Sequence, residues 1–290
     1  MHIFRLILFF VFWAAQIQTA LAGDKIAYAH LTDGYWQIFI QDPSGNDQRQ
    51  VTFSKYDKRN PTWVNGRTLA YRTNNGQLFV IDIDGQNEKE ILSQYRNISN
   101  PHFCSRTREV VFVRYDPALV DIGDIWISDI EGARARVIAK YTGLQYQPNI
   151  SPEGEMVVFV KVDKEDKHSH NLWIMNKDGN NSRQLTFEKG YNTLPVFSLD
   201  GKKVIFVSKK EDSDYEIYET DIGNGQMRRL TEDSGLDISP SYSPDGQKIV
   251  FVSDRKGNQQ LWIMDSDGKN ASLLTHDKEE SIDPAWGESE

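Results

Sequence analysis

A few side chains of this 290-residue chain have the type and spacing that chemistry needs. His168 and His170 are two residues apart, so on an extended segment both imidazoles would face one side and could bind a transition metal with a third ligand from a neighbouring loop. Their charged surroundings are also typical of a solvated polar loop. His102, Asp237 and Asp283 lie close to prolines that recur along the chain, and they are the candidates for a pocket of convergent catalytic groups. For His102 the alternative is a hydrogen-bonded side chain at the inner end of a strand.

The sequence lacks the motifs of well-known enzyme classes. It has no G-x-S-x-G elbow, no H-E-x-x-H, no Walker loop and no paired-cysteine metal site. Asp-x-Asp-Gly segments recur, but they lack the remaining ligands of a calcium loop, and a tight turn already explains their Asp and Gly. We therefore expect no catalytic residue, no metal and no cofactor, in a protein that is not an enzyme.

The N-terminal segment is typical of a secretory signal peptide. Residues 1–22 contain Arg5, an apolar run over 6–15 and the small-residue triplet Ala20-Leu21-Ala22, so we expect cleavage near Ala22. An uncleaved N-terminal anchor is the alternative. No later stretch is apolar for long enough to span a bilayer, and we expect no membrane span.

Charge and cysteine usage narrow the possible partners and the source of stability. The net charge is −9 at pH 7, with acidic and basic residues interspersed, which argues against a nucleic-acid partner. Cys104 is the sole cysteine, so no intramolecular disulfide can form and the fold must depend on packing. We expect this thiol to be buried and unreactive.

An aromatic residue followed 22 residues later by a proline occurs six times along the chain. The pairs are Phe39/Pro61, Phe79/Pro101, Trp126/Pro148, Trp173/Pro195, Tyr218/Pro240 and Trp262/Pro284. Successive pairs are 40 to 47 residues apart, a period typical of radial or stacked repeat architectures. We expect six repeats over about residues 24–66, 67–108, 109–154, 155–201, 202–246 and 247–290.

Each repeat contains the signals of four short strands. An apolar run such as Val204-Ile205-Phe206 predicts a buried strand, the repeated aromatic lies in the next strand, and a Gly-containing turn leads to a third, more polar strand. The fourth strand is expected to begin at the repeated proline, where the loss of a ladder donor is tolerated. Four short strands in each repeat of this length are the signature of a propeller blade.

The turn sequences carry a specific resemblance. Ser151-Pro152-Glu153-Gly154, Ser198-Leu199-Asp200-Gly201 and Ser243-Pro244-Asp245-Gly246, each leading into a buried strand, resemble the repeats of the TolB-type β-propeller family. The similarity covers nearly all of residues 23–290 and is weaker in the first three repeats. It implies an all-β fold, a six-bladed β-propeller of four-stranded antiparallel blades over residues 23–290.

Chain order predicts how such a ring closes. The expected domain starts at the strand around Ile26–Tyr28 and ends just after the strand around Pro284–Trp286. We expect these two strands to pair, which would leave no open sheet edge between the first and last blades.

Loop lengths indicate which face carries function. The separation between the buried strand and the repeated aromatic varies from 8 to 14 residues, whereas the other spacings hardly change. In an up-and-down blade these variable loops share a face with the crossovers to the next blade, and binding residues concentrate on loops held by a rigid scaffold. Tyrosine and arginine on these crossovers suit protein recognition, although any one of them could instead pack or solvate the loop. The predicted partner-binding residues are Tyr56, Arg59, Tyr95, Arg96, Tyr146, Tyr191, Asn192, Asp237 and Asp283.

The TolB-type resemblance implies a role in cell-envelope assembly, in which the propeller mouth receives a peptidoglycan-associated lipoprotein. Only about three residues separate the expected cleavage site from the first strand, so we expect the N-terminal domain of TolB-type proteins to be absent. We expect a monomeric periplasmic scaffold that binds a protein partner, such as that lipoprotein or an outer-membrane component, through the long-loop face and channel mouth. The alternative is a propeller enzyme, a lyase or hydrolase, or a metal-binding protein with its site at the channel mouth.

Overall fold

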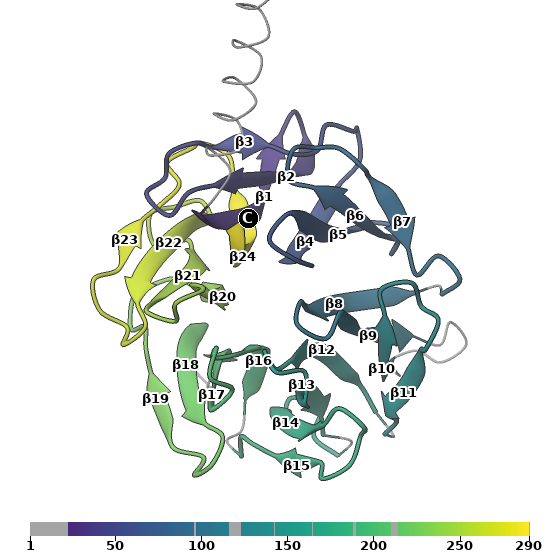
Figure 1. Cartoon of the computed structure of the whole chain (residues 1–290). Coiled ribbons are helices and arrows are strands. Elements are labelled where there is room, and N and C mark those ends of the chain that lie inside the picture. The colour runs from purple at the N-terminus through teal and green to yellow at the C-terminus, as the bar shows by residue number, and fades with distance from the viewer. Residues whose placement is uncertain are drawn as a thin grey trace, which may run out of the picture.

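The computed structural model describes residues 23–95, 97–115, 123–141, 143–163, 165–187, 190–209 and 214–289. The described strands form six blades arranged around a central axis (Figure 1), so the predicted all-β six-bladed propeller is confirmed. The described chain contains no helix long and apolar enough to cross a bilayer. The expected signal peptide, residues 1–22, and the predicted site residue Arg96 lie outside the described residues.

Each blade consists of four strands, ordered from the central channel outwards. Blade 1 contains β24 (Ser281–Ser289), β1 (Gly23–Thr32), β2 (Tyr35–Gln41) and β3 (Arg49–Gln50); blade 2 contains β4 (Lys58–Trp63), β5 (Thr68–Thr73), β6 (Leu78–Asp82) and β7 (Lys89–Ile91). Blade 3 contains β8 (Ile98–Cys104), β9 (Glu109–Tyr115), β10 (Gly123–Asp129) and β11 (Arg136–Ala139); blade 4 contains β12 (Gln145–Ile150), β13 (Met156–Val162), β14 (His170–Asn176) and β15 (Arg183–Gln184). Blade 5 contains β16 (Tyr191–Phe197), β17 (Lys203–Lys209), β18 (Glu216–Asp221) and β19 (Met227–Arg229); blade 6 contains β20 (Asp237–Tyr242), β21 (Lys248–Ser253), β22 (Gln260–Asp265) and β23 (Ser272–Leu273). A single parallel pair, His170 with Tyr191, links the sheets of blades 4 and 5.

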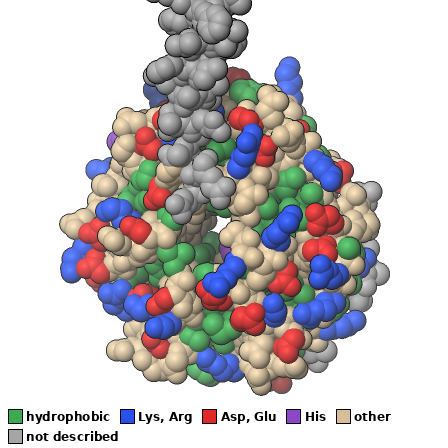
Figure 2. Space-filling model, in the orientation of Figure 1, with side chains coloured by type: hydrophobic (Ala, Val, Ile, Leu, Met, Phe, Trp, Pro, Cys, Tyr) green, Lys and Arg blue, Asp and Glu red, His purple; other side chains and the backbone are tan. Residues whose placement is uncertain are grey.

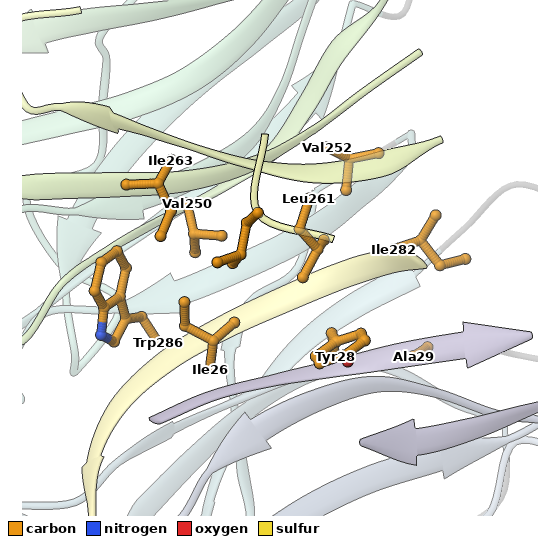
Figure 3. Close-up of a cluster of buried hydrophobic side chains, with 10 residues drawn as sticks. Ile26, Tyr28, Ala29, Val250, Val252, Leu261, Ile263, Ile282 and Trp286 are labelled. Carbon is orange, nitrogen blue, oxygen red and sulfur yellow. The ribbon is translucent and has the colours of Figure 1, made fainter. Parts of the chain in front are cut away.

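The first and last strands of the domain meet in blade 1. β24 pairs antiparallel with β1, which places Trp286 opposite Ile26 and Ala285 opposite Ala27. This is the predicted pairing of the C-terminal strand with the N-terminal strand. Ile26 and Trp286 pack against Val250 of blade 6 in the cluster shown in Figure 3, so blades 6 and 1 share one hydrophobic core.

The core of the molecule lies in the seams between neighbouring blades. In β21, Ile249 and Phe251 pack toward blade 5, whereas Val250 and Val252 pack toward blade 1. Successive side chains of a strand point to opposite faces of its sheet, so a strand covered by a blade on each side is apolar at every position. This explains why the second strand of each blade is a continuous apolar run. The six hydrophobic clusters each occupy one seam.

Each repeated aromatic, in the third strand of its blade, lies opposite an aromatic residue of the second strand. The directly opposite residues are Tyr28 and Phe39, Tyr71 and Phe79, Phe112 and Trp126, Phe159 and Trp173, Phe206 and Tyr218, and Phe251 and Trp262. In blade 2 the two rings are stacked, with centroids 5.7 Å apart. Because directly opposite aromatic pairs stabilise a sheet, selection for this contact accounts for an aromatic at the same place in every repeat.

The repeated prolines lie inside the innermost strands, and the prediction that each begins its strand is wrong. Pro61 is the fourth residue of β4, and Pro240 is the fourth residue of β20. In all six blades the register between the innermost strand and its neighbour shifts at this point, which marks a bulge. A bulge leaves a backbone donor without a partner, so it tolerates a residue that has no N–H.

The residue before each of these prolines has a left-handed backbone. The φ angles are 53° for Asn60, 48° for Asn100, 50° for Gln147, 52° for Leu194, 52° for Ser239 and 53° for Asp283. Such a conformation costs a non-glycine residue about 1–3 kcal/mol, and asparagine and aspartate adopt it most readily. The six bulges stand at equivalent positions along the channel wall. We call these six residues the pre-proline ring.

Hairpins between the third and outer strands attach each blade to the preceding one. At four seams an outer-strand arginine donates from Nη2 to a carbonyl in the next blade's hairpin, a contact that we call the arginine latch. The donor and acceptor pairs are Arg49 and Ile83 (2.8 Å), Arg136 and Lys177 (3.1 Å), Arg183 and Ile222 (2.6 Å), and Arg228 and Ser266 (3.4 Å). The hairpin glycine also approaches the preceding blade closely, since a Cβ on Gly268 would lie 2.5 Å from the Leu230 carbonyl oxygen.

Strand direction distinguishes two faces of the ring. The tight-turn face carries the turns from innermost to second strand and the hairpins from third to outer strand. The long-loop face carries the loops between second and third strands and the crossovers to the next blade. Cys104, at the end of β8, is buried as predicted, and its thiol lies 3.4 Å from the Pro152 carbonyl oxygen.

Candidate functional site

Three aromatic side chains of blade 1 and its crossover are exposed on the long-loop face. The exposed fractions are 74% for Phe53, 41% for Tyr56 and 36% for Tyr35, and we call these residues the blade 1 aromatic patch. The crossover that carries Phe53 and Tyr56 is held against β2, because Asp57 Oδ1 accepts a hydrogen bond from the Trp36 backbone N–H at 3.0 Å. Hydrogen bonds from the Asn74 side-chain amide and from the Trp36 N–H lower the pKa of Asp57, so the contact involves a carboxylate at neutral pH.

A buried lysine supports Tyr56 from inside the molecule. Lys58 is 0% exposed, and its Nζ lies 4.0 Å from the centre of the Tyr56 ring. The ammonium donates to Gln37 Oε1 at 3.2 Å and to Ser54 Oγ, and burial lowers the pKa of Lys58. Because the cation sits under the ring, Tyr56 is ordered before any partner arrives, which reduces the entropy lost on binding.

Arg59 and Asp283, both predicted partner contacts, form an ion pair with each other. Arg59 Nε lies 2.8 Å from Asp283 Oδ2, and the guanidinium lies 4.7 Å from the centre of the Trp36 ring. Asp283 also accepts a hydrogen bond from the Asn60 backbone N–H at 3.2 Å, and only 13% of its side chain is exposed. The pair therefore joins blades 1 and 2 beside the aromatic patch. Asp283 acts mainly as a structural support.

Tyr146 and Tyr191 meet the histidine pair on the long-loop face of blades 4 and 5. The Tyr146 hydroxyl lies 2.5 Å from His170 Nδ1, and the Tyr191 hydroxyl lies 3.0 Å from His168 Nδ1. Since His170 Nε2 lies 3.1 Å from the Lys167 carbonyl, we assign the proton to Nε2, so that Tyr146 donates to Nδ1. Burial lowers the pKa of His170 and raises the pKa of Tyr146, so both groups are uncharged at neutral pH.

The same geometry bears on the metal-binding alternative. Both ring nitrogens of His170 already have hydrogen-bond partners, so a metal could bind there only after one of these bonds is broken. Among the residues that the structure describes, no group of three or more His, Cys, Asp or Glu side chains could hold a metal ion. His168 and His170 thus have no third ligand in the described part of the chain.

Two predicted partner contacts, Asn192 and Asp237, are buried, which corrects the prediction that they are available to a partner. Asp237 is 0% exposed, and its two carboxylate oxygens accept hydrogen bonds from Arg255 Nη2 at 2.9 and 2.7 Å. Asn192 is 1% exposed, donates to the His170 carbonyl at 3.0 Å and accepts from Ser208 Oγ at 2.9 Å. Both residues lie in the innermost strands three residues before the repeated proline, where the structure has strand rather than exposed loop.

Tyr95 packs into the seam between blades 2 and 3. Its ring centroid lies 6.0 Å from that of Phe112 and 5.9 Å from that of Trp126, and its hydroxyl donates to the Gly132 carbonyl at 3.3 Å. The side chain is half-buried rather than presented on the surface. Tyr95 therefore has the packing role that was the alternative to partner binding.

A hollow of about 880 Å³ occupies the tight-turn half of the central channel. Its lining runs from the pre-proline ring to turn residues such as Arg106, Leu199 and Pro244, and of the predicted partner-binding residues only Asp283 contributes to it. Figure 2 shows an opening at the centre of the ring, with acidic and basic side chains mixed over the visible face. The main hollow therefore lies away from the crossovers on which the partner site was predicted.

His102 lines this hollow as an uncharged imidazole. Its Nδ1 accepts a hydrogen bond from the Ile150 backbone N–H at 3.3 Å, across the seam between blades 3 and 4. Burial lowers the pKa of His102 to about 4, so the ring is neutral at pH 7. At the next seam Asn149 accepts in the same way from the Phe197 N–H at 3.3 Å. His102 thus has the structural role that was the alternative to catalysis.

Three exposed aromatic residues were not among the site residues predicted from the sequence. Phe187 on the long-loop face is 76% exposed, and Phe53 and Tyr35 belong to the blade 1 aromatic patch. Phe53 and Phe187 both directly follow a buried threonine at the end of an outer-strand segment, in Val51-Thr52-Phe53 and Leu185-Thr186-Phe187. A phenylalanine at a position where other repeats have Glu232 or His276 was the signal that could have identified them.

Solved structures similar to this chain share its fold. TolB from Acinetobacter baumannii superposes with a TM-score of 0.77 at 22% identity, over 90% of this chain and 66% of that chain. A putative TolB from Agrobacterium tumefaciens gives 0.72 at 19% identity, over 88% and 89%, and an oligogalacturonate lyase from Vibrio parahaemolyticus gives 0.60 at 17% identity, over 88% and 75%. This chain therefore spans about two thirds of the length of the Acinetobacter protein. Because the similar structures include both TolB proteins and a lyase, the fold alone does not determine the function of this chain.

Sequence comparison gives the family directly. No curated protein matches the chain significantly. The family model described as the TolB beta propeller domain matches residues 72–213 and 207–290, which together make up most of the described propeller. The matched residues run from blade 2 to the last strand of the ring and include five of the six repeated aromatics, and the chain belongs to the TolB β-propeller family.

Proposed function

We propose that this protein is a non-enzymatic scaffold of the cell envelope that binds a protein partner on its long-loop face, beside the channel mouth. The observation that carries the proposal is the exposure of Tyr35, Phe53 and Tyr56 on the long-loop face of blade 1 and its crossover. Aromatic side chains are enriched in the cores of protein interfaces, where they bury a large area against a partner. Arg59, stacked on Trp36 at the edge of the patch, supplies the polar rim.

The partner is a protein of the periplasm, either a peptidoglycan-associated lipoprotein or an outer-membrane component. The membership of the TolB β-propeller family supports this class of partner, and the expected signal peptide supports the location. The mixed surface charge supports a protein partner rather than nucleic acid, because nucleic-acid binding needs a continuous basic surface. The propeller acts as a monomer in this proposal.

The states of the candidate catalytic residues support a binding role. His102 is neutral and accepts a backbone hydrogen bond, Asp237 is buried against Arg255, and Asp283 is paired with Arg59. A hydrolase or lyase needs titratable groups that converge on one pocket and remain free to exchange protons. Each of these three residues instead holds two parts of the scaffold together.

The test is capture of the partner by crosslinking in cells, with wild type and a Tyr35→Ser, Phe53→Ser double variant. This variant removes apolar surface and leaves the contact between Lys58 and Tyr56 intact. Loss of two interface aromatics should weaken a discrete complex about 30-fold or more. Leu199→Ser is the matched control, because Leu199 is 43% exposed on the tight-turn face. Equal capture by wild type and the double variant would refute the proposed surface.

A further inference from the structure

The seam between blades 2 and 3 lacks the arginine latch found at four other seams. At this seam the equivalent position in the outer strand is Lys89, which pairs with Val80 in the same register in which Arg49 pairs with Ile40. Among the hydrogen bonds of the described residues, none joins Lys89 to the Ile130 carbonyl, the acceptor that the latch would use. The neighbouring hairpin carbonyls of Glu131 and Gly132 accept instead from Gln94 Nε2 and the Tyr95 hydroxyl, each at 3.3 Å. Within the described part of the chain, the Ile130 carbonyl and the Lys89 ammonium are the acceptor and donor that this seam leaves without a partner.

The glycine contact also differs at this seam. A Cβ on Gly132 would meet the side chains of Gln94 and Leu92, not an outer-strand carbonyl as at Gly268. Leu92 occupies the position that the buried Thr52 has in blade 1, where the threonine hydroxyl accepts a hydrogen bond from a backbone N–H. Leu92 cannot make this bond, and its backbone is left-handed, with φ of 52°. The end of this outer strand therefore turns away from its usual course.

The seam contains an open cavity of about 530 Å³ on the tight-turn side. Its floor is apolar and includes Val64, Val80, Leu92, Phe103 and Ile130. At the two latched seams where the equivalent residue is also an isoleucine it is covered, since Ile83 is 2% exposed and Ile222 is 8% exposed, whereas Ile130 is only half-buried. A cavity of this size can hold one or two large side chains.

The rim of this cavity carries charges of both signs. Lys89, Glu90, Arg108 and Glu131 line it, and none of them has an ion pair within the described residues. An apolar floor with a mixed polar rim is the arrangement found where an anchor side chain of one protein enters a pocket of another. Simple anions and cations fit less well, because each would meet a like charge.

We propose that this seam is a docking site for an extended peptide segment of a partner protein, with one large apolar side chain seated in the cavity. A peptide unit offers one carbonyl acceptor and one N–H donor. The Lys89 ammonium can donate to that carbonyl, and the Ile130 carbonyl can accept from that N–H, so the segment replaces the missing latch. This site lies apart from the blade 1 aromatic patch and does not depend on the function proposed for that patch.

The test uses capped tripeptides and amide signals of the ¹⁵N-labelled protein. Acetyl-Gly-Leu-Gly-amide and acetyl-Gly-Trp-Gly-amide should shift the signals of Leu92, Glu131 and their neighbours. Both should bind at least about tenfold more tightly than acetyl-Gly-Ser-Gly-amide, because the apolar side chain is transferred out of water. Signals of the latched hairpin at Lys177 and Asp178 should not move. Absent shifts, or equal shifts at the latched seams, would overturn the proposal.

A second arm restores the missing latch. Lys89→Arg should raise the midpoint of thermal unfolding and weaken tripeptide binding about fivefold, because the guanidinium competes for the Ile130 carbonyl at the cost of one hydrogen bond to the peptide. Arg136→Lys at the seam between blades 3 and 4 is the matched control, and it should lower thermal stability without creating a peptide site. A more stable Lys89→Arg variant that binds both apolar tripeptides as tightly as wild type would contradict the assignment of Lys89.

Discussion

The hairpin glycines allow a sharp test of how neighbouring blades are held together. Gly268 has a left-handed backbone, with φ of 90°, and a Cβ there would lie 2.5 Å from the carbonyl oxygen of Leu230 in the preceding blade. Gly225 occupies the equivalent hairpin of blade 5 with φ of 70°, and a Cβ there would meet no atom within 4 Å. The two glycines share the backbone requirement, and only Gly268 has the contact.

The expected cost of Gly268→Ala follows from two terms. A left-handed alanine costs about 1–2 kcal/mol relative to glycine, and this term applies to Gly225→Ala as well. A methyl group 2.5 Å from a backbone oxygen forces the hairpin outward and stretches the bond from Arg228 to the Ser266 carbonyl, which adds about 2 kcal/mol of overpacking strain. Gly268→Ala should therefore be less stable than Gly225→Ala by about 2 kcal/mol.

Thermal unfolding of the two variants measures this difference. For a domain of this size about 2 kcal/mol corresponds to a difference of about 4–8 °C in Tm, with urea unfolding as the independent check. Gly179→Ala provides a second case, since its Cβ would contact the Ile138 carbonyl of blade 3. If Gly268→Ala, Gly179→Ala and Gly225→Ala lose the same stability, close approach between blades is not what these positions require, and the reasoning fails.

Three further predictions concern buried groups and ring closure. His102→Asn should make the free energy of unfolding less dependent on pH below neutrality. The folded pKa of His102, about 4, lies below the unfolded value near 6.5, so protonation of the unfolded state destabilises wild type as the pH falls. Between pH 6.5 and 4, urea unfolding should show that wild type loses up to about 3 kcal/mol more than the variant. Arg255→Met leaves the Asp237 carboxylate buried without its partner and should cost about 3–5 kcal/mol in the same assay, much of it recovered when Asp237→Leu is added. Deletion of residues 282–290 removes most of β24 and exposes the edge of β1, so the truncated chain should no longer unfold cooperatively as a monomer. A monomeric truncated chain with an unchanged Tm would disprove closure of the ring by β24.

The fold was predictable because its repeated distances are local. The interval between Phe39 and Pro61 covers a hairpin, an outer strand and a crossover, and the same path recurs in every blade. The apolar runs were also readable, since each second strand is covered on both faces. The position of the prolines within their strands could not be predicted. A proline at the start of a strand and a proline in a bulge give the same sequence pattern, and only the pairing between strands distinguishes them.

The candidate site was harder to predict because exposure depends on contacts that are remote in sequence. Asp237 has the residue type of a surface loop, yet Arg255, 18 residues later, returns to it and neutralises it inside the seam. Phe53 has the residue type of a core, yet no neighbouring blade covers it and it is 74% exposed. Residue types and spacing gave the scaffold, but the partners that bury or expose a single side chain come from tertiary structure.

Binding of a protein partner to the blade 1 aromatic patch on the long-loop face is the function proposed for this propeller. Site-specific photocrosslinking in cells tests it most directly, with the photoreactive residue placed at Tyr56 in one strain and at Leu199 on the tight-turn face in another. We expect one discrete crosslinked envelope protein from the Tyr56 position, and loss of this product when Phe53→Ser is added. The same product from Leu199 with none from Tyr56 would contradict the assigned face, and no product from either position would contradict a binding role for the propeller.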